Sequence, residues 1–304
     1  MPVRRILAAA ATSFVLAATV ATTVVAGAAK PAPGAAPGAA PGAAPAAAAR
    51  LLAVTSLPVR AQPASSLVVR YVALGDSYSA GTGAGRYSAA GKSCERSASA
   101  FPQLWAARHD PASFVSVACA GATTATVRTK QLSALSARTT LVSITIGGND
   151  VGFSQVMETC VFQLNSACVK AVNTAESSVR KVLPGRLDRL LRAIRTRAPL
   201  ARIVVLGYPD LYDLSQSRDC VGIGTAKRAA LNQGAGVLDR ALSAAAARNH
   251  DPFADVRPEF ARHEICDGST SYLNALTFPL DGSYHPNAAG QKSGYLGAFS
   301  RGTG

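Results

Sequence analysis

The apolar positions of the chain change their period several times after about residue 66. Four short runs rich in β-branched residues are typical of buried strands. They span residues 67–74, 114–117, 140–146 and 203–206. Longer segments of helical character lie between and after these runs. They span residues 98–108, 123–135, 169–198 and 225–248.

Strands that alternate with helices predict βαβ units, in which each helix crosses over to a parallel strand. A short piece at 253–256 and a last helix from about Pro286 complete the pattern, and Pro184-Gly185 is a candidate break in the long helix. We therefore expect an α/β fold of three layers, with a mostly parallel sheet covered on both faces. The loops at the carboxyl ends of its strands form one rim, where such sheets bind their ligands.

The N-terminal region has a different composition. Arg4 and Arg5 precede an uncharged apolar stretch at 6–29, which contains an A-x-A pattern at 26–28. This arrangement predicts a secretory signal peptide over residues 1–28, so we expect the protein to be secreted. An uncleaved membrane anchor is the alternative, because the apolar stretch is long enough to span a bilayer.

A low-complexity segment follows the predicted signal peptide. Residues 29–65 contain a repeated Pro-Gly-Ala-Ala unit and an alanine run. Such a segment cannot bury a core, and we interpret it as a disordered spacer. Residues 66–304 are then enough for one domain with an ample core.

Six cysteines follow the predicted signal peptide. In an exported chain they indicate three disulfides, for which fifteen pairings exist in principle. The pairing between neighbours in the sequence closes the shortest loops and crosses nothing. It joins Cys94 to Cys119, Cys160 to Cys168 and Cys220 to Cys266. A zinc site is not expected, because the sequence has no C-x2-C pair.

The net charge of +14 raises the question of an anionic partner. Basic residues cluster only in 180–202, where apolar residues recur at helical spacing with four arginines interleaved. The four are Arg186, Arg189, Arg192 and Arg195. A solvated helix face is the simplest interpretation, and an anionic lipid or cell-wall surface is the functional alternative. Nucleic acid is not expected, because an exported chain without aromatic-interleaved basic motifs lacks the features that bind it.

Three loops of the predicted rim contain groups that suit acyl transfer. Ser77 lies after the first strand, Gly121 after the second and Asn149 after the third. Acyl transfer needs a nucleophile, a base and donors aimed at the developing oxyanion. The Ser77 hydroxyl can serve as the nucleophile. The N–H groups of Ser77 and Gly121, with the side-chain amide of Asn149, can form the oxyanion hole.

Four histidines are candidates for the general base. His109 and His250 each precede an Asp-Pro pair, where a surface or capping role is expected, and His263 lies in a segment that ends in a cysteine. His285 lies in the loop 281–287, which runs directly into a predicted helix. A histidine on such a loop can project over the rim, so His285 is the predicted base.

Four sequence blocks resemble the signature blocks of the SGNH (GDSL) esterase and lipase family, in the same order and at matching spacing. They are Gly-Asp-Ser-Tyr-Ser from position 75, Ala-Gly-Ala from 120, Gly-Gly-Asn-Asp from 147 and His-Pro-Asn from 285. The signal peptide and six cysteines resemble the secreted actinobacterial branch, whose members have three locally paired disulfides. The resemblance implies a flavodoxin-like α/β/α domain with a Ser77 nucleophile and a His285 base. It also implies an oxyanion hole of Ser77, Gly121 and Asn149, without a metal or an organic cofactor.

The sequence departs from the family pattern at one position. Many family members place a catalytic aspartate three residues before the histidine, but Gly282 occupies that position and Asp281 lies one residue earlier. In parts of the secreted branch a backbone carbonyl orients the ring instead. We therefore favour a Ser77–His285 dyad held by the carbonyl of Gly282 or Ser283 over a triad with Asp281.

These features predict a monomeric, secreted serine esterase or lipase. Its expected substrates are acylglycerols, short- to medium-chain esters or phospholipids. A carbohydrate acetyl esterase is the alternative enzyme, and a non-catalytic surface-binding module is the alternative outside catalysis. Four aromatic residues near the turns are candidates to line an apolar acyl site. They are Tyr78, Phe153, Tyr208 and Tyr284.

Overall fold

The computed structural model describes residues 68–215, 220, 223–268 and 270–304. The predicted signal peptide and spacer lie outside these residues, so both remain predictions. The described residues contain one parallel sheet in the order β2-β1-β3-β4-β5. Its strands are β1 (Arg70–Gly75), β2 (Ser113–Ser116), β3 (Leu141–Thr145), β4 (Arg202–Leu206) and β5 (Phe253–Ala254).

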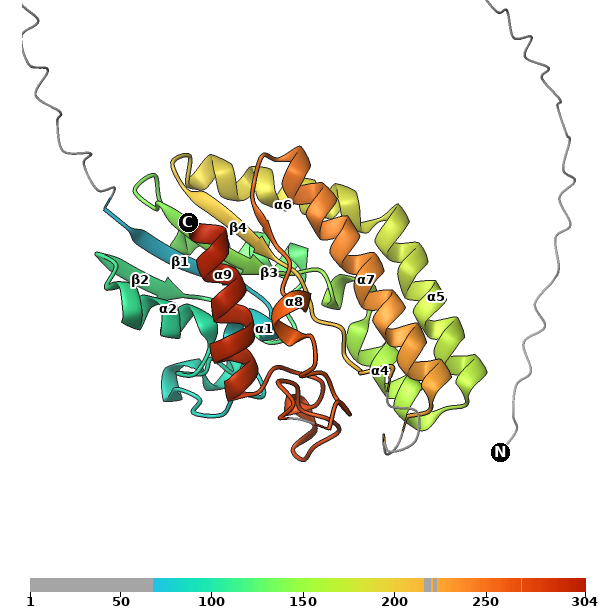
Figure 1. The fold of residues 1–304 in the computed structure, drawn as a ribbon. Coiled ribbons are helices and arrows are strands. Elements are labelled where there is room, and N and C mark those ends of the chain that lie inside the picture. The colour runs from blue at the N-terminus through green and yellow to red at the C-terminus, as the bar shows by residue number, and fades with distance from the viewer. Residues whose placement is uncertain (1–67, 216–219, 221–222, 269) are drawn as a thin grey trace, which may run out of the picture. The chain divides into compact units, whose positions relative to one another are not determined.

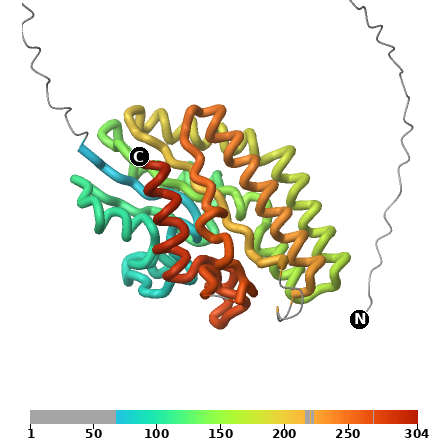
Figure 2. Tube along the Cα trace, in the orientation of Figure 1, coloured from blue at the N-terminus to red at the C-terminus, as the bar shows by residue number. Residues whose placement is uncertain are grey.

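Helices cover both faces of this sheet (Figure 1). One face packs against α2 (Phe101–His109) and α9 (Leu296–Thr303), and the other against α7 (Thr225–Arg248). Helices α5 (Asn165–Lys181) and α6 (Leu183–Arg197) pack against α7 in the same layer. Helices α5 and α7 lie side by side along most of their length (Figure 2). The three-layer α/β prediction is therefore confirmed.

Shorter elements complete the described chain and lie mostly at the carboxyl ends of the strands. The short α-helices are α1 (Ser77–Ala80), α3 (Thr124–Thr126), α4 (Phe153–Phe162) and α8 (Arg257–Phe260). The 3-10 and π segments are η1 (Ala89–Cys94), η2 (Val127–Gln131), η3 (Leu132–Ala134), η4 (Asn149–Val151), η5 (Leu280–Gly282) and η6 (Gly290–Tyr295). No helix in the described ranges is long and apolar enough to cross a membrane.

The helices differ from the sequence prediction in several places. The long predicted helix is divided at Val182, and Pro184 lies in the first turn of α6, where a missing N–H costs no hydrogen bond. Helix α4 was not predicted, although Met157 and Cys160 form its buried face at helical spacing. The last helical segment starts after Asn287, because Pro286 pairs with Leu273 in a short antiparallel bridge.

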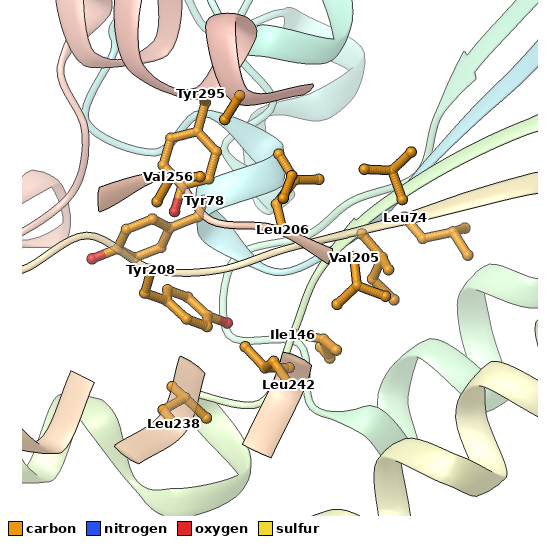
Figure 3. Packing of buried hydrophobic residues seen from close by; sticks show 14 of the residues in the cluster. Leu74, Tyr78, Ile146, Val205, Leu206, Tyr208, Leu238, Leu242, Val256 and Tyr295 are labelled. Atoms are coloured by element: carbon orange, nitrogen blue, oxygen red, sulfur yellow. The ribbon is translucent and has the colours of Figure 1, made fainter. Parts of the chain in front are cut away.

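The core lies between the sheet and its two helical layers. All five residues of β3 are buried, as expected for a central strand covered on both faces. Figure 3 shows Leu238 and Leu242 of α7 packed below the sheet, with Tyr295 on the other side. This two-sided packing holds the carboxyl ends of β1, β3 and β4 in fixed relative positions.

Three disulfides join segments that flank the rim. They pair Cys94 with Cys119, Cys160 with Cys168 and Cys220 with Cys266, which is the pairing that closes the shortest loops. The Cys94–Cys119 bridge precedes Gly121 by two residues and ties that loop to η1. The loop after β2 is thus fixed covalently as well as by hydrogen bonds.

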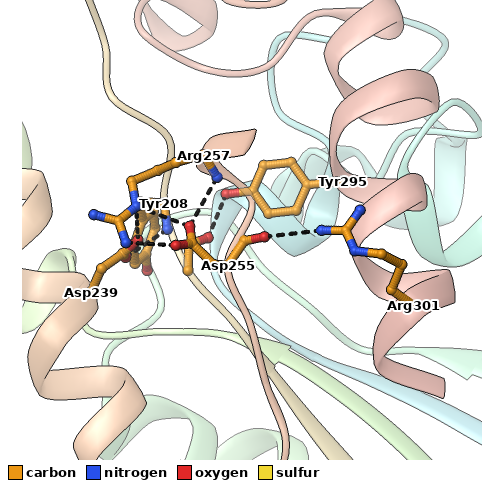
Figure 4. Close-up of polar contacts among 7 residues, drawn as sticks. Tyr208, Asp239, Asp255, Arg257, Tyr295 and Arg301 are labelled. Atoms are coloured by element: carbon orange, nitrogen blue, oxygen red, sulfur yellow. Dashed lines mark hydrogen bonds and ion pairs between the residues drawn. The ribbon is translucent and has the colours of Figure 1, made fainter. Parts of the chain in front are cut away.

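A buried polar network fixes the loop after β4 (Figure 4). The backbone N–H of Tyr208 donates to Asp239 Oδ1 at 2.8 Å, and the Tyr295 hydroxyl donates to the Gly207 carbonyl at 2.8 Å. Arg257 lies 3.6 Å from Asp239 and forms an ion pair with Asp255. Burial raises the pKa of Asp239 to about 8. The network holds Tyr208 in place in the loop after β4, at the rim of the sheet.

Candidate active site

Ser77 lies at the end of β1, next to the point where the strand order reverses between β1 and β3. Ligands of open α/β sheets bind at this switch point. Gly75 ends the strand with φ +123°, and a side chain there would lie 2.4 Å from the Thr145 carbonyl oxygen. The tight turn leaves Ser77 as the first residue of α1, buried except for 8% of its surface. The serine is thus presented by a turn that requires glycine at position 75.

His285 meets Ser77 across 208 positions of sequence. Its Nε2 lies 2.8 Å from Ser77 Oγ, and its Nδ1 lies 2.9 Å from the Ser283 carbonyl oxygen. Because a carbonyl only accepts, Nδ1 carries the proton and donates it to Ser283. Nε2 is then free to accept the hydrogen of the Ser77 hydroxyl, which is the arrangement of a nucleophile and its general base.

The charge state of His285 suits this role. Desolvation lowers its pKa to about 4, and this effect outweighs the opposing influence of the Ser283 carbonyl and the Asp281 charge. The imidazole is therefore neutral at pH 7, and it can accept a proton without first losing one.

The hydrogen-bond geometry distinguishes between the groups that could orient the His285 ring. The Ser283 carbonyl holds Nδ1, whereas the Gly282 carbonyl accepts from Asn274 Nδ2 at 3.0 Å. Asp281 lies on the exposed segment η5. The contacts of the ring fit the favoured dyad, with Ser283 rather than Gly282 as the source of the carbonyl.

The three predicted oxyanion donors lie on loops that bond to one another. Cys119 donates from its backbone N–H to the Gly75 carbonyl at 3.0 Å, and Asn149 Nδ2 donates to the Ala122 carbonyl at 3.0 Å. One hydrogen of the Asn149 amide stays available. The backbone N–H groups of Ser77 and Gly121 donate to no other group in the described part of the chain.

The backbone conformation of Gly121 accounts for its residue type. An ideal Cβ at this position meets no protein atom within 4 Å. Gly121 has φ +75°, a conformation that other residues rarely adopt. The glycine therefore sets the direction of the loop and of its N–H.

Asp76 has a positioning role that sequence reasoning did not assign. Its carboxylate accepts from the Tyr78 N–H at 3.1 Å, from Thr145 Oγ1 at 2.7 Å and from the Tyr208 hydroxyl. It is 1% exposed, and burial raises its pKa to about 6. The group caps α1 and joins the loops after β1 and β4. Its place beside Ser77 in the first signature block was the available signal.

A cavity starts at Ser77 and extends toward α4, α5 and α7. Tyr78, Phe153 and Tyr208 line it as predicted, together with apolar residues of the three helices. Tyr284 does not line this cavity; it is buried elsewhere, and its carbonyl accepts from the Tyr78 hydroxyl at 2.7 Å. The prediction for Tyr284 was wrong because its loop turns the ring toward Tyr212.

The basic helix α6 has fewer solvated charges than its sequence indicated. Arg186 lies 3.2 Å from the buried carboxylate of Asp150, and Arg195 lies 2.7 Å from that of Asp251. Arg186 and Arg195 are themselves partly exposed, and Arg189 and Arg192 are exposed. Two of the four arginines of the predicted cationic face therefore form ion pairs with buried carboxylates.

The other histidines lie outside the Ser77–His285 pair. His109 stacks on Trp105 with ring centroids 4.1 Å apart, and His263 stacks on Tyr272 at 3.9 Å. His250 has φ +58° just beyond the end of α7. In the described ranges no cluster of three or more histidine, cysteine or acidic side chains could hold a metal ion.

A parallel sheet with a Ser–His pair and free N–H donors at its switch point has the organisation of a serine hydrolase. The sequence profile of the GDSL-like Lipase/Acylhydrolase family matches residues 73–292, and the chain belongs to this family. The family resemblance found in the four blocks is thereby confirmed, and the protein is a carboxylic ester hydrolase.

Relatives support this assignment. The chain is 47% identical to Lipase 1 of Streptomyces coelicolor, over 78% of this chain and 87% of that protein. It is 46% identical to a lipase of Streptomyces rimosus, over 77% of this chain and 86% of that protein. Among solved structures, phospholipase A1 from Streptomyces albidoflavus NA297 and the extracellular lipase of Streptomyces rimosus each superpose with a TM-score of 0.75. Both are 45% identical to this chain, and the match covers 77% of it and 99% of theirs.

Proposed function

We propose that the protein is a secreted lipase or esterase that cleaves carboxylic esters through an acyl-enzyme on Ser77. The 2.8 Å contact between Ser77 Oγ and His285 Nε2 carries the proposal. It joins a nucleophile to a neutral base in one site, next to unpaired N–H donors and an apolar cavity.

In the first step, His285 Nε2 takes the Ser77 proton as Oγ attacks the ester carbonyl carbon. The oxygen of the tetrahedral intermediate receives hydrogen bonds from the N–H groups of Ser77 and Gly121 and from the Asn149 amide. The Ser283 carbonyl holds the imidazolium through its Nδ1–H. His285 then protonates the departing alcohol, and the acyl group stays on Ser77.

In the second step, His285 takes a proton from water, whose oxygen attacks the acyl carbon. The same three donors stabilise the second intermediate. Return of the proton to Ser77 releases the carboxylic acid and restores the free enzyme. Each proton transfer uses the same Nε2 atom, so one histidine serves both half-reactions.

The cavity suggests that the acyl chain lies between α4, α5 and α7. Its lining is mainly apolar, with Val156, Val172, Leu231 and Leu238 among its members. An apolar site of this kind gains free energy from each buried methylene, which favours acyl groups longer than acetyl. Acylglycerols, medium-chain esters and phospholipids are therefore the proposed substrates, in line with the lipase and phospholipase names of the relatives.

Export is part of the proposal. The three disulfides suit an oxidising compartment, and one superposed relative is an extracellular lipase. The predicted signal peptide supplies the route. N-terminal sequencing of protein from the culture medium tests this point, and intact protein retained with the cells, residues 1–28 included, would contradict it.

Labelling with a fluorophosphonate tests the nucleophile. We expect the wild-type protein to react and Ser77→Ala to remain unlabelled while keeping its circular dichroism spectrum. Ser79→Ala is the matched control, because Ser79 is buried two residues away and its hydroxyl binds Thr145 instead of His285. Equal labelling of Ser77→Ala and wild type would refute the assignment.

A substrate series tests the acyl site. We expect kcat/KM for p-nitrophenyl esters to rise from acetyl to medium chains, with hydrolysis of a phospholipid and little release of acetate from acetylated xylan. A strong preference for acetyl groups, with turnover of the xylan, would instead indicate a carbohydrate esterase.

A further inference from the structure

The loop that ends at the catalytic pair has an unusually apolar surface. Every residue from 275 to 281 is exposed, and five of these seven residues are apolar. Phe278 is 92% exposed, Leu280 56% and Leu276 51%. Consecutive exposed apolar residues are costly for a protein in water unless they have a function. We name residues 274–284 the docking loop.

The docking loop is closed at its base. The Asn274 N–H donates to the His285 carbonyl at 2.9 Å, and the Tyr284 N–H donates to the Asn274 carbonyl at 3.0 Å. Higher in the loop, Ser283 Oγ bonds to the N–H of Thr277 at 3.0 Å and to its carbonyl at 3.2 Å. These bonds fix the two ends of the docking loop, so its apolar side chains extend from a fixed backbone.

The same support is shared with the active site. The Ser283 hydroxyl bonds to Thr277, which lies near the tip of the loop, and the Ser283 carbonyl accepts from His285 Nδ1. In Figure 1 this segment belongs to the orange-red coil between α8 and α9. Apolar side chains that enter a lipid surface from this loop would therefore bring the mouth of the Ser77 site to that surface.

We propose that the docking loop inserts Leu276, Phe278 and Leu280 into the surface of aggregated lipid substrate and so presents the active site to it. This inference rests on the proposed action on lipid esters. Residues beside the loop have suitable chemistry for the headgroup region. Asn274 Nδ2 donates to the Gly83 carbonyl at 3.0 Å, and the Gly83 N–H donates to the hydroxyl of the exposed Tyr87 at 2.8 Å. Tyrosine suits the zone where headgroups meet water.

A second copy of the chain is a poorer occupant. Three large apolar side chains bury at most roughly 500–700 Å² in all, whereas a stable interface buries about 800 Å² on each partner. A lipid surface needs no complementary shape. Without Arg4 and Arg5 of the predicted signal peptide, the chain has 29 basic and 17 acidic residues, a net charge of +12. This charge also favours a lipid surface that carries anionic headgroups over self-association.

Vesicle binding is the primary test, in a Ser77→Ala background so that lipid is not consumed. We expect the Ser77→Ala protein to co-sediment with phosphatidylcholine vesicles, more strongly when phosphatidylglycerol is included. Adding Phe278→Ser should weaken partitioning about 10-fold or more, because a buried phenylalanine contributes at least that factor. The control is Leu200→Ser, another exposed apolar residue (75%) just before β4, which should change nothing.

A fluorescence reporter tests insertion directly. The chain has one tryptophan, Trp105, which is buried in the core. In Phe278→Trp, we expect the added emission to shift to the blue on vesicle addition and to be quenched by brominated lipid. Emission that stays unshifted and unquenched while the protein is vesicle-bound would overturn the assignment of this loop. This fluorescence measurement does not depend on the stability of the Phe278→Ser variant.

Activity measurements separate this inference from the proposed function. In the Ser77-containing protein, Phe278→Ser should keep kcat/KM on monomeric p-nitrophenyl acetate within about twofold and lose about 10-fold on vesicular phospholipid. Equal vesicle binding of Phe278→Ser and parent, or loss of a dimer in sedimentation velocity on this substitution, would overturn the docking role. Failure of the wild type to hydrolyse any ester, with vesicle binding intact, would instead refute the proposed function alone.

Discussion

The proposed nucleophile and the proposed base of this site come from two regions that are held in opposite ways. Ser77 follows a central strand, and its neighbour Asp76 is buried and bonded to groups from α1, β3 and the loop after β4. His285 follows a loop whose preceding residues 275–281 are all exposed. The first region is buried like a protein interior. In the second region, hydrogen bonds fix the two ends of the loop, and its apolar tip is exposed to water.

The two regions meet two different requirements of the reaction. An oxyanion hole stabilises charge only if its donors are already aimed before the reaction, which a buried and cross-bonded rim provides. The base needs one orientation of one ring, and a single carbonyl at Ser283 supplies it. The outer part of the docking loop is then free to meet a substrate surface without disturbing the donors.

The largest effect among the following substitutions should come from the buried region. Asn149→Ala removes one oxyanion donor, and we expect kcat to fall by about 10²–10³ with KM nearly unchanged. Steady-state kinetics on a soluble p-nitrophenyl ester measures this change. A loss smaller than about fivefold would mean that Asn149 does not face the developing charge.

A glycine at the boundary of the two regions tests how closely they must fit. A Cβ at Gly83 would lie 2.7 Å from Asn274 Nδ2 and 3.0 Å from His285 Cβ, so Gly83→Ala should displace the base. We expect kcat to fall about 10- to 100-fold, because small misplacements of catalytic groups have effects of this size. Gly85→Ala is the matched control, since Gly85 also has positive φ but no atom within 4 Å. Equal losses in both variants would show that backbone strain alone is responsible.

The pH dependence tests the environment of the base. Because the pKa of His285 is lowered to about 4, the imidazole stays neutral until the pH falls well below the ordinary histidine value of about 6.5. We expect the acid limb of kcat/KM on a soluble ester to have its midpoint more than one pH unit below 6.5. A midpoint at or above 6.5 would contradict a desolvated, neutral base.

The same shift has a consequence for stability with a defined sign. The folded state holds His285 neutral, so the unfolded state takes up its proton at higher pH. Stability from this group is therefore present above about pH 6.5 and is lost as the pH falls toward 4. Thermal melting of wild type and His285→Gln between pH 7 and 4 should show a steeper decrease for the wild type.

The smallest effect should come from the exposed carboxylate. Asp281→Asn should change kcat less than about threefold, because the ring is held by Ser283 and not by Asp281. Steady-state kinetics on a soluble p-nitrophenyl ester measures this change, and circular dichroism checks that the variant is folded. A loss of about 10³ or more would restore the Ser-His-Asp interpretation.

The sequence determined much of this molecule through local rules. The change of apolar period located four of the five strands, and the glycines of the rim marked turns that need positive φ, such as Gly75 and Gly121. Ser77, Gly121 and Asn149 were selected because each follows one of the first three strands, and loops after parallel strands share one edge. His285 was selected by its loop before the last helix and by the family resemblance. The locally paired disulfides also followed from their order in the chain.

Only the tertiary structure decided which groups touch. Asp76 reaches Tyr208 across 132 positions, Arg186 and Arg195 turn to buried carboxylates, and Tyr284 leaves the acyl cavity. The choice of the Ser283 carbonyl over Gly282 and Asp281 depended on the closure of one loop. Such contacts depend on packing between distant segments, which has no period in the sequence. The periodic pattern fixes each element, but the direction of a side chain on an irregular loop is set by what folds against it.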